Sequence, residues 1–267
     1  MGLFVKVRKW LTDPRLPGVD VNSDDLLKIH KKILREKKLM NKVFSDFYDA
    51  CYSADVKYFK GEGKRVEIGA GVSFFKEKYP EVYSTDIKFA EGLDAVLDAQ
   101  NMDLPDESVR AIYGLNCFHH FPEPEKFFCE LDRVLVPGGG CVLIEPYHGF
   151  VASRFYKKLF DTETFDMKQK SWSNSDNQIM TGANQALSYI VFTRDLQHFS
   201  RKFPTLKIVK QRALNNYLEY LLSGGLNFRS IISYNLRLIP LIFQFLNYPI
   251  RNIFALHHII IIQKKHE

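Results

Sequence analysis

Residues 66–73, with the sequence VEIGAGVS, are the feature that most restricts the fold of this chain. They predict a buried apolar strand that runs into a turn with two glycines, Gly69 and Gly71, and residues 74–78 can open a helix after it. A ligand at such a turn would contact backbone amides at the start of a helix, with no side chain in between. The same turn also occurs in ordinary strand-to-helix corners, so its meaning depends on the residues downstream of it.

Strands and helices alternate over residues 64–146. We expect strands at 82–86, 109–115 and 140–145, with helices near 74–78 and 125–135. Alternation of this kind is typical of a parallel sheet that helices cover on both faces. The sequence therefore predicts a doubly wound α/β domain, which binds its ligand at the carboxyl ends of the strands.

Acidic residues stand where two of these segments end. Asp86 closes the second strand and can accept two hydrogen bonds from a ribose diol bound over the glycine turn. Asp98 and Ala99 end the next segment, where a carboxylate and a backbone amide can pair with the edge of an adenine. Each acidic residue alone would also serve as a cap or turn residue. Their order and spacing together favour a nucleotide-type cofactor.

Composition places the chain among ordinary globular proteins, with 46% hydrophobic and 25% charged residues. The four cysteines have no metal-ligand or disulfide spacing, so we expect no metal site, and a reducing, cytoplasmic location is the default. Charge is uneven along the chain. Residues 1–60 carry 13 Lys and Arg against 8 Asp and Glu, residues 61–149 carry 8 against 16, and residues 150–267 carry 16 against 7. The basic flanks therefore either face an anionic partner or simply solvate helices.

The N-terminal region is predicted to be helical. Residues 1–11 form a short basic amphipathic piece, which either packs on the core or lies on an anionic membrane surface. Residues 44–59 place aromatic side chains three to four residues apart, as in a helix that buries an aromatic stripe. Tyr48 or Tyr52 could instead close over a ligand at the glycine turn.

Two segments lie outside the alternating pattern. Residues 171–177 form a polar loop, which serves either as a lid or as a plain surface excursion. Residues 215–255 are rich in apolar side chains, yet Arg237 and Pro240 interrupt them, so they do not predict a membrane span. This segment either packs on the core or exposes an apolar surface to lipid.

Five motifs in series resemble the class I S-adenosylmethionine-dependent methyltransferases, in particular the small-molecule branch similar to the methyltransferase type 11 family. The motifs lie at residues 67–71 (EIGAG), 86 (D), 98–106 (DAQNMDLPD), 116–122 (NCFHHFP) and 130–140 (ELDRVLVPGGG). The resemblance implies S-adenosyl-L-methionine as the cofactor, with the glycine turn and the region of Asn116 at its methionine end. The cofactor-binding residues that it implies are Glu67, Gly69, Ala70, Gly71, Asp86, Ile87, Asp98, Ala99 and Asn116.

The resemblance also implies the architecture: a Rossmann-like, mostly parallel sheet of seven strands whose last strand, near 259–262, is antiparallel. We expect residues 1–60 to form an N-terminal helical cap and residues 61–214 the cofactor-binding α/β core, with a lid-like insertion at 149–190. Residues 215–255 would be an apolar helical insertion, and residues 256–267 would hold the last strand of the core.

Methyl transfer requires a base only when the acceptor must lose a proton. The candidates are Tyr147 and His148, just past the predicted strand at 140–145, together with His119 and His120. Because a His-His pair is common in the family at this place, where it shapes the pocket, we favour His148.

Basic flanks and an apolar insertion fit a small or lipid-linked acceptor, such as a bacterial surface-glycan intermediate methylated on oxygen. A quinone or another lipid-soluble ring is the alternative acceptor, and a non-catalytic S-adenosylmethionine-binding regulatory protein is the alternative class. A nicotinamide-dependent dehydrogenase would need a third glycine where Phe74 stands. No nucleic-acid partner is expected, because no recognition motif accompanies the charge. Peripheral contact with the inner face of a membrane and the oligomeric state stay open.

Overall fold

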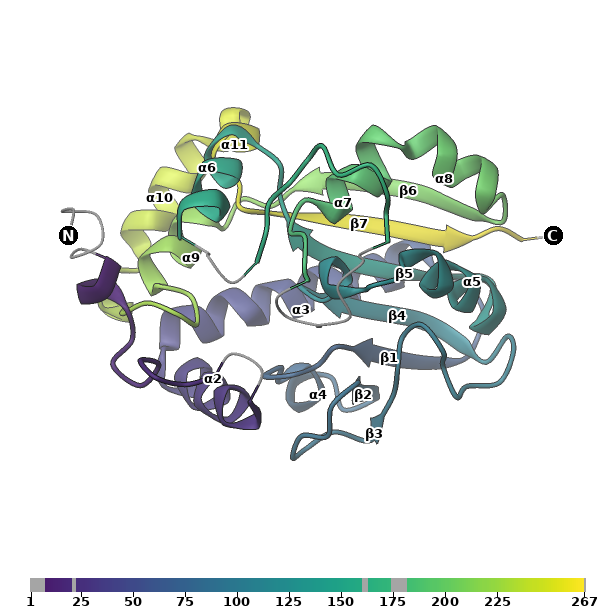
Figure 1. Cartoon of the computed structure of the whole chain (residues 1–267), viewed down its shortest axis with the longest axis horizontal. Helices are drawn as coiled ribbons and strands as arrows, with labels where there is room; N and C mark the ends of the chain where they lie inside the picture. The colour runs from purple at the N-terminus through teal and green to yellow at the C-terminus, as the bar shows by residue number, and fades with distance from the viewer. Residues whose placement is uncertain (1–7, 21–22, 160–162, 174–181, 267) are drawn as a thin grey trace.

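The computed structural model describes residues 8–20, 23–159, 163–173 and 182–266, which fold around one seven-stranded sheet (Figure 1). The strand order is β3-β2-β1-β4-β5-β7-β6. The strands are β1 (Lys64–Ile68), β2 (Val82–Asp86), β3 (Ala95–Val96), β4 (Val109–Leu115), β5 (Leu135–Pro146), β6 (Leu206–Ala213) and β7 (His257–Lys264). This is the predicted Rossmann-like, mostly parallel sheet.

Strand β7 is antiparallel and lies between β5 and β6, as the family resemblance implied. Its run of four isoleucines, Ile259–Ile262, is buried on both faces of the sheet. β-Branched side chains fit such a doubly covered strand. In the register with β5, Ile144 pairs with Ile259. Strand β5 starts at Leu135, earlier than predicted, because the segment Pro137–Gly139 continues the strand instead of preceding it.

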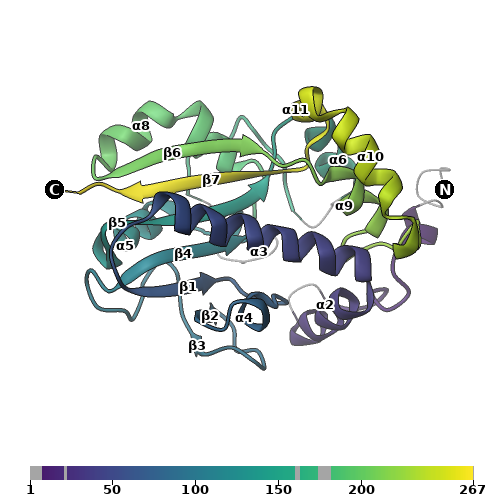
Figure 2. The ribbon, with the colours of Figure 1, turned by 180° about the vertical axis from the view of Figure 1, so that it is seen from behind.

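Helices cover both faces of the sheet, and each face has its own apolar core. On one face α5 (Pro124–Val134) and α8 (Leu196–Lys202) contribute phenylalanines such as Phe128 and Phe199. The other face is crossed by the long helix α3 (Lys38–Tyr58), seen in front of the sheet in Figure 2, and by the short α4 (Phe75–Lys78). Phe44, Phe47 and Tyr48 of α3 are buried there, which confirms the predicted aromatic stripe.

A buried carboxylate fixes α3 to the sheet. Asp55 is fully buried and accepts hydrogen bonds from the guanidinium groups of Arg65 in β1 and Arg110 in β4, at 2.7 and 2.8 Å. The hydroxyl of Tyr113 in β4 donates a third bond, at 2.7 Å. A buried charge is tolerated when it is paired and hydrogen-bonded in this way.

Helices inserted around the core gather beyond the carboxyl ends of the parallel strands, on the left in Figure 1. They are α2 (Asp24–Glu36), α6 (Phe150–Leu159), α9 (Tyr217–Ser223), α10 (Leu238–Leu246) and α11 (Arg251–Phe254). Residues 8–11 form a helical turn that joins them, since the amide of Arg229 donates to the carbonyl of Leu11 at 2.7 Å. Short turns complete the chain: η1 (Phe118–His120), α7 (Leu187–Tyr189), η2 (Ile190–Arg194), η3 (Tyr234–Leu236) and η4 (Tyr248–Ile250).

Of the two segments left open by the sequence, the lid-like loop lies partly outside the described residues, which stop at 173 and resume at 182. Its Trp172 is buried and donates from Nε1 to Asp195 at 2.9 Å, so the start of the loop is anchored to the core. The apolar insertion is described in full. Within the described residues, no helix has the length and apolar character needed to cross a membrane.

Candidate functional site

A cavity of about 250 Å³ opens at the carboxyl ends of β1, β2 and β4. This is where a doubly wound sheet binds its ligand. The cavity is lined by six of the nine predicted cofactor residues, namely Gly69, Asp86, Ile87, Asp98, Ala99 and Asn116. The sheet thus brings together residues from separate motifs.

The glycine turn has a backbone that other residues would strain. Gly69 has φ +59° and Gly71 has φ +46°, both in the left-handed region that glycine adopts freely. A Cβ atom on Gly69 would lie 2.6 Å from Cβ of Cys117, which belongs to the loop after β4. The absence of a side chain at Gly69 therefore lets these two loops meet and form one wall of the cavity.

Asp86 has both a structural role and a place at the cavity. Its carboxylate accepts from the backbone amides of Gly71 and Lys88, each at 2.9 Å, and so ties the end of β2 to the glycine turn. A carboxylate offers about four acceptor positions. Two of them therefore serve the backbone, and the others suit a pair of ligand hydroxyls.

Asp98 is likewise both a turn residue and part of the cavity wall. It accepts from the amide of Gln100 at 2.8 Å, the local role that the sequence left open. It also borders the cavity beside Ala99. Asp98 can therefore be a turn residue and still border the ligand site.

Three predicted cofactor residues, Glu67, Ala70 and Gly71, are not part of the cavity lining. Glu67 is buried and accepts from the hydroxyl of Ser84 at 2.7 Å, while its other carboxyl oxygen has no hydrogen-bond partner among the described residues. Burial raises the pKa of Glu67 to about 7. The amide of Ala70 donates to the carbonyl of Thr85, which fixes the turn to β2.

Helix α2 forms another wall of the cavity, a contribution that the sequence did not predict. Ser23, Leu26, Leu27 and His30 line the cavity. The hydroxyl of Ser23 caps α2 by accepting from the amide of Leu26. Burial lowers the pKa of His30 to about 4, so its imidazole is neutral near pH 7. An amphipathic helix would pack somewhere on the core, but nothing in its pattern indicated this cavity.

The loop after β4 is organised around Glu145, which is fully buried at the end of β5. One carboxylate oxygen accepts from the amides of Cys117 and Phe118, at 3.0 and 2.9 Å. The other lies 2.6 Å from Nδ1 of His119. Burial opposes the charge of His119, but the carboxylates of Glu145 and Glu163 overcome it and raise its pKa to about 10. Asn116 begins this loop with φ +51°.

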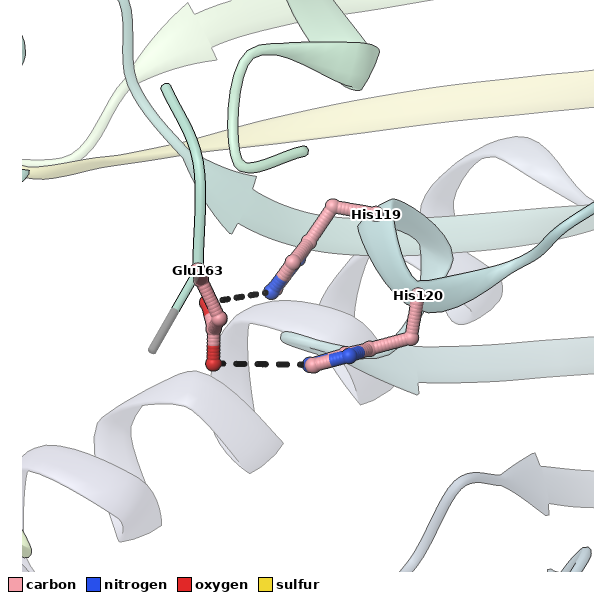
Figure 3. A group of neighbouring side chains, drawn as sticks. All are labelled: His119, His120 and Glu163. Carbon is pink, nitrogen blue, oxygen red and sulfur yellow. Dashed lines mark ion pairs between the residues drawn. The ribbon is translucent and has the colours of Figure 1, made fainter. Parts of the chain in front are cut away.

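His119, His120 and Glu163 lie together beside the cavity (Figure 3). Nε2 of His119 is 3.4 Å from one carboxylate oxygen of Glu163, and Nε2 of His120 is 3.9 Å from the other. His120 also lines the cavity. The sequence indicated both histidines as pocket-shaping residues, whereas Glu163 carried no signal because it lies far along the chain.

The predicted bases Tyr147 and His148 come directly after β5 and are not part of the cavity lining. The imidazole of His148 packs against the rings of Tyr147, Tyr189 and His258. Burial lowers the pKa of His148, and its Nδ1 has no hydrogen-bond partner among the described residues. The side chain is therefore a neutral imidazole whose Nδ1 is buried and has no hydrogen-bond partner among the described residues.

Neither tyrosine considered as a ligand cover lines the cavity. The hydroxyl of Tyr48 accepts from the amide of Phe74 at 2.8 Å and from the hydroxyl of Ser73 at 3.1 Å. Tyr52 stacks on Tyr79, with ring centroids 4.1 Å apart. Tyr48 thus supports the end of the glycine turn.

Comparison with known proteins agrees with this geometry. Residues 66–143 match the model of a family described as "Methyltransferase domain". No curated protein matches the chain in sequence. The geranyl diphosphate C-methyltransferase of Streptomyces coelicolor A3(2), a solved structure, superposes with a TM-score of 0.53 at 14% identity, over 96% of this chain and 90% of that one.

Two further solved structures are similar to a lower degree. Phosphoethanolamine N-methyltransferase 2 of Haemonchus contortus has a TM-score of 0.43 at 13% identity, over 80% of this chain and 52% of that one. An S-adenosylmethionine-dependent methyltransferase of Mesorhizobium loti has a TM-score of 0.45 at 12% identity, over 80% of this chain and 97% of that one. The fold assignment rests on the Streptomyces structure, because the other two have TM-scores below 0.5.

The sheet order, the domain match and the cavity define the class of this protein. Residues 66–143 form a methyltransferase domain, and this domain within its sheet supports S-adenosylmethionine-dependent methyltransferase activity, as the sequence resemblance implied. Its cofactor is S-adenosyl-L-methionine, and the residues present fit it. The turn is free of side chains at Gly69, and the carboxylates of Asp86 and Asp98 border the cavity with acceptor positions to spare.

Proposed function

We propose that the protein methylates an oxygen atom of a small or lipid-linked acceptor, such as an intermediate of bacterial surface-glycan assembly. The observation that carries this proposal is that the cavity opens at the carboxyl ends of the parallel strands and that α10 exposes apolar side chains. Figure 1 shows α10 at that same end of the sheet. The nine predicted cofactor residues are part of the proposal. Asp86 would hold the ribose, Asp98 and Ala99 the adenine, and the glycine turn with Asn116 the methionine end.

The cofactor supplies a methyl group that its positive sulfur already makes electrophilic. The protein then has to position the acceptor and exclude water. Helix α2 is placed for the second task, since Leu26 and Leu27 line the cavity with apolar side chains. An acceptor hydroxyl also needs a base, and we keep His148 and Tyr147 for this role. The neutral imidazole of His148 and its unpaired Nδ1 support it as a proton acceptor.

The apolar surface, here called the insertion face, is unusual because its main helix exposes its apolar side. In α10 the buried residues are Pro240 and Gln244, whereas the large apolar side chains point to solvent. Gln244 fastens the helix to α9: its Oε1 accepts from the amides of Leu218 and Glu219, at 2.8 and 3.2 Å. The exposed members of the insertion face are Ile231, Leu236, Leu238, Ile239, Leu241, Ile242, Phe243, Phe245, Leu246, Tyr248 and Ile250.

Charge indicates what covers the insertion face. Residues 220–255 contain Arg229, Arg237 and Arg251 but no Asp or Glu. Arg237 and Arg251 lie over the rings of Tyr234 and Tyr248, at 4.4 and 4.2 Å from the ring centroids. Exposed apolar side chains rimmed by arginine and tyrosine suit the interface of an anionic bilayer. We therefore propose peripheral contact of this face with an anionic membrane.

The helical turn at residues 8–11 extends this surface. Trp10 is 68% exposed, and Lys9 is beside it in the sequence. Thr12 bridges to Phe228, which places the turn against the start of the insertion. A second, mainly apolar cavity of about 140 Å³ lies between the turn, α6 and α9, where Leu11, Phe155 and Leu221 line it. Such a cavity suits part of a hydrocarbon chain.

Methylation of a quinone or another lipid-soluble ring is the second candidate, because the insertion face would serve that acceptor as well. Incubating the protein with cell extract and radiolabelled S-adenosylmethionine distinguishes a lipid-linked saccharide acceptor from a lipid-soluble ring. Label in the organic-soluble fraction supports a lipid-linked acceptor, and mild acid should then release it into water if a saccharide is attached. Label that stays in the organic phase indicates a ring. Label confined to the water-soluble fraction before acid treatment would overturn the lipid-linked proposal.

Membrane contact is tested separately, with vesicles that contain anionic lipid. Replacing both Ile242 and Phe245 by glutamate should weaken binding at least about tenfold, because burial of each apolar side chain contributes about 1.5–3 kcal/mol. Phe89→Glu is the matched control: Phe89 is also an exposed phenylalanine, but it lies in the loop after β2. Equal vesicle binding by the wild type and the double variant would contradict the proposed contact.

A further inference from the structure

We infer that His119, His120 and Glu163 form a binding site for one divalent transition-metal ion, beside the cofactor cavity. Each residue offers one ligand atom, and the three atoms lie within 4.8 Å of one another. Figure 3 shows both imidazoles turned toward the carboxylate of Glu163, each toward one of its two oxygens. The sequence predicted no metal site, because its cysteines lack metal-ligand spacing.

The arrangement of the two rings is the first argument. Their centroids are 4.2 Å apart, and both rings turn Nε2 toward the same carboxylate of Glu163. A single cation between the three atoms would replace the proton on Nε2 of His119, and both imidazoles and the carboxylate could then donate electron pairs to it.

The support behind His119 is the second argument. Its Nδ1 is 2.6 Å from the carboxylate of Glu145, so the ring is oriented with Nε2 toward Glu163. Glu145 is itself held by the amides of Cys117 and Phe118. A histidine ligand that donates its second N–H to a carboxylate is the usual support of a metal site, where it fixes the ring and raises its basicity. The site is thus built before any metal arrives.

The set of ligands indicates the metal. Two imidazole nitrogens and one carboxylate suit Zn²⁺, Fe²⁺, Co²⁺ or Mn²⁺, whereas Mg²⁺ and Ca²⁺ prefer oxygen ligands alone. Three protein ligands leave coordination positions open. His120 borders the cofactor cavity, so an open position next to it would be available to an oxygen of the acceptor. This role rests on the proposed function, whereas metal binding does not.

Cobalt binding gives a direct test that needs no enzyme activity. The whole protein, stripped with a chelator, should bind one equivalent of Co²⁺ and develop visible absorption bands, which Zn²⁺ then displaces. His120→Ala and Glu163→Gln should each weaken Co²⁺ binding at least about 100-fold, since each removes a ligand. Glu145→Gln, which acts through His119, should weaken it about 10- to 100-fold. His198→Ala and Glu62→Gln replace an exposed histidine and an exposed glutamate, and should bind as the wild type does.

Two outcomes would overturn the inference: substoichiometric Co²⁺ without absorption bands, or binding by His120→Ala and Glu163→Gln within twofold of the wild type. Circular dichroism and calorimetric binding of S-adenosylmethionine show whether each variant is folded. If Co²⁺ binds as expected while no methyl transfer is found, the metal site stands and the proposed function fails. If methyl transfer occurs and no metal binds, the proposed function stands and the metal site is overturned.

Discussion

The acidic core and the basic additions around it differ in how their residues are used. In residues 61–149 the side chains with distinctive chemistry, such as Asp86 and Glu145, are tied to the backbone by two hydrogen bonds each. In residues 215–255 the distinctive side chains are apolar, and they are turned toward solvent. The first region fixes its polar side chains around the cofactor cavity, and the second leaves its apolar side chains exposed, as the proposed membrane contact requires.

This difference also determines how much of each region's role can be predicted from the sequence. Cofactor chemistry requires particular residues at particular strand ends, so the core has recognisable motifs. A surface for a lipid or an acceptor requires only apolar area and positive charge, which many sequences supply. Four experiments test whether the two regions differ in this way.

The largest effect is expected at His148, where the core meets the additions. His148→Ala should lower kcat by about 10² to 10⁴, the contribution typical of a general base. The dissociation constant of S-adenosylmethionine should not change, because His148 is not part of the cofactor cavity. Label transferred from radiolabelled cofactor measures turnover, and calorimetry measures binding. An active variant would remove His148 from the mechanism and leave Tyr147 as the candidate base.

The next effect is the pH dependence of the free energy of unfolding that arises from two histidines at the start of β7. His257 and His258 are buried, and burial lowers the pKa of each to about 3. The unfolded chain takes up these protons near pH 6.5, so it binds more protons than the folded protein between about pH 3 and 6.5. Stability should therefore fall as pH drops through this interval, by about 1.4 kcal/mol per pH unit for each histidine.

Urea unfolding at pH 7, 6 and 5 measures this loss. His258→Gln should flatten the dependence, because it removes one of the two groups, whereas His198→Gln changes an exposed histidine and should leave the slope unaltered. Equal slopes in the wild type and in His258→Gln would mean that His258 takes up its proton in the folded protein as well.

The fold was predictable from the sequence where the signal is local. Residues 109–115 and 259–262 are β-forming runs that specify their strands without help from the rest of the chain. Asp86 was predicted to border the ligand site because it ends the strand beside the glycine turn, and it does line the cavity. In each case neighbouring residues carry the information.

Tertiary contacts account for what could not be predicted. Leu27 meets the cavity only because α2 folds over it, and Glu163 meets the two histidines only because its segment returns to the loop after β4. In α10 the composition indicated an apolar helix. Which side of this helix faces the protein depends on Gln244, whose hydrogen-bond partners lie in α9. A periodic pattern gives a helix its faces and does not say which face is covered.

Asp86→Ala should weaken S-adenosylmethionine binding by about 1–3 kcal/mol, because it removes acceptors from the ligand and leaves the amides of Gly71 and Lys88 without their partner. Calorimetric titration measures the change. Asp103→Ala is the matched control, since Asp103 is an exposed aspartate of the same region that does not line the cavity. Unchanged affinity in Asp86→Ala would show that the core does not hold the cofactor as proposed.

The smallest effect is expected on the insertion face, and it tests directly how the two regions differ. Phe245 is 80% exposed, so Phe245→Glu should change the free energy of unfolding by less than about 0.5 kcal/mol. Gln244→Leu, at the preceding position, should cost about 1–3 kcal/mol, because it leaves the amides of Leu218 and Glu219 unpaired. In an ordinary amphipathic helix the polar residue would be the harmless site and the aromatic one the costly site. Urea unfolding of both variants therefore decides which side of α10 is covered in solution. A large loss in Phe245→Glu would mean that the apolar side is already buried, against the core or a second copy of the chain, and is not available to a membrane.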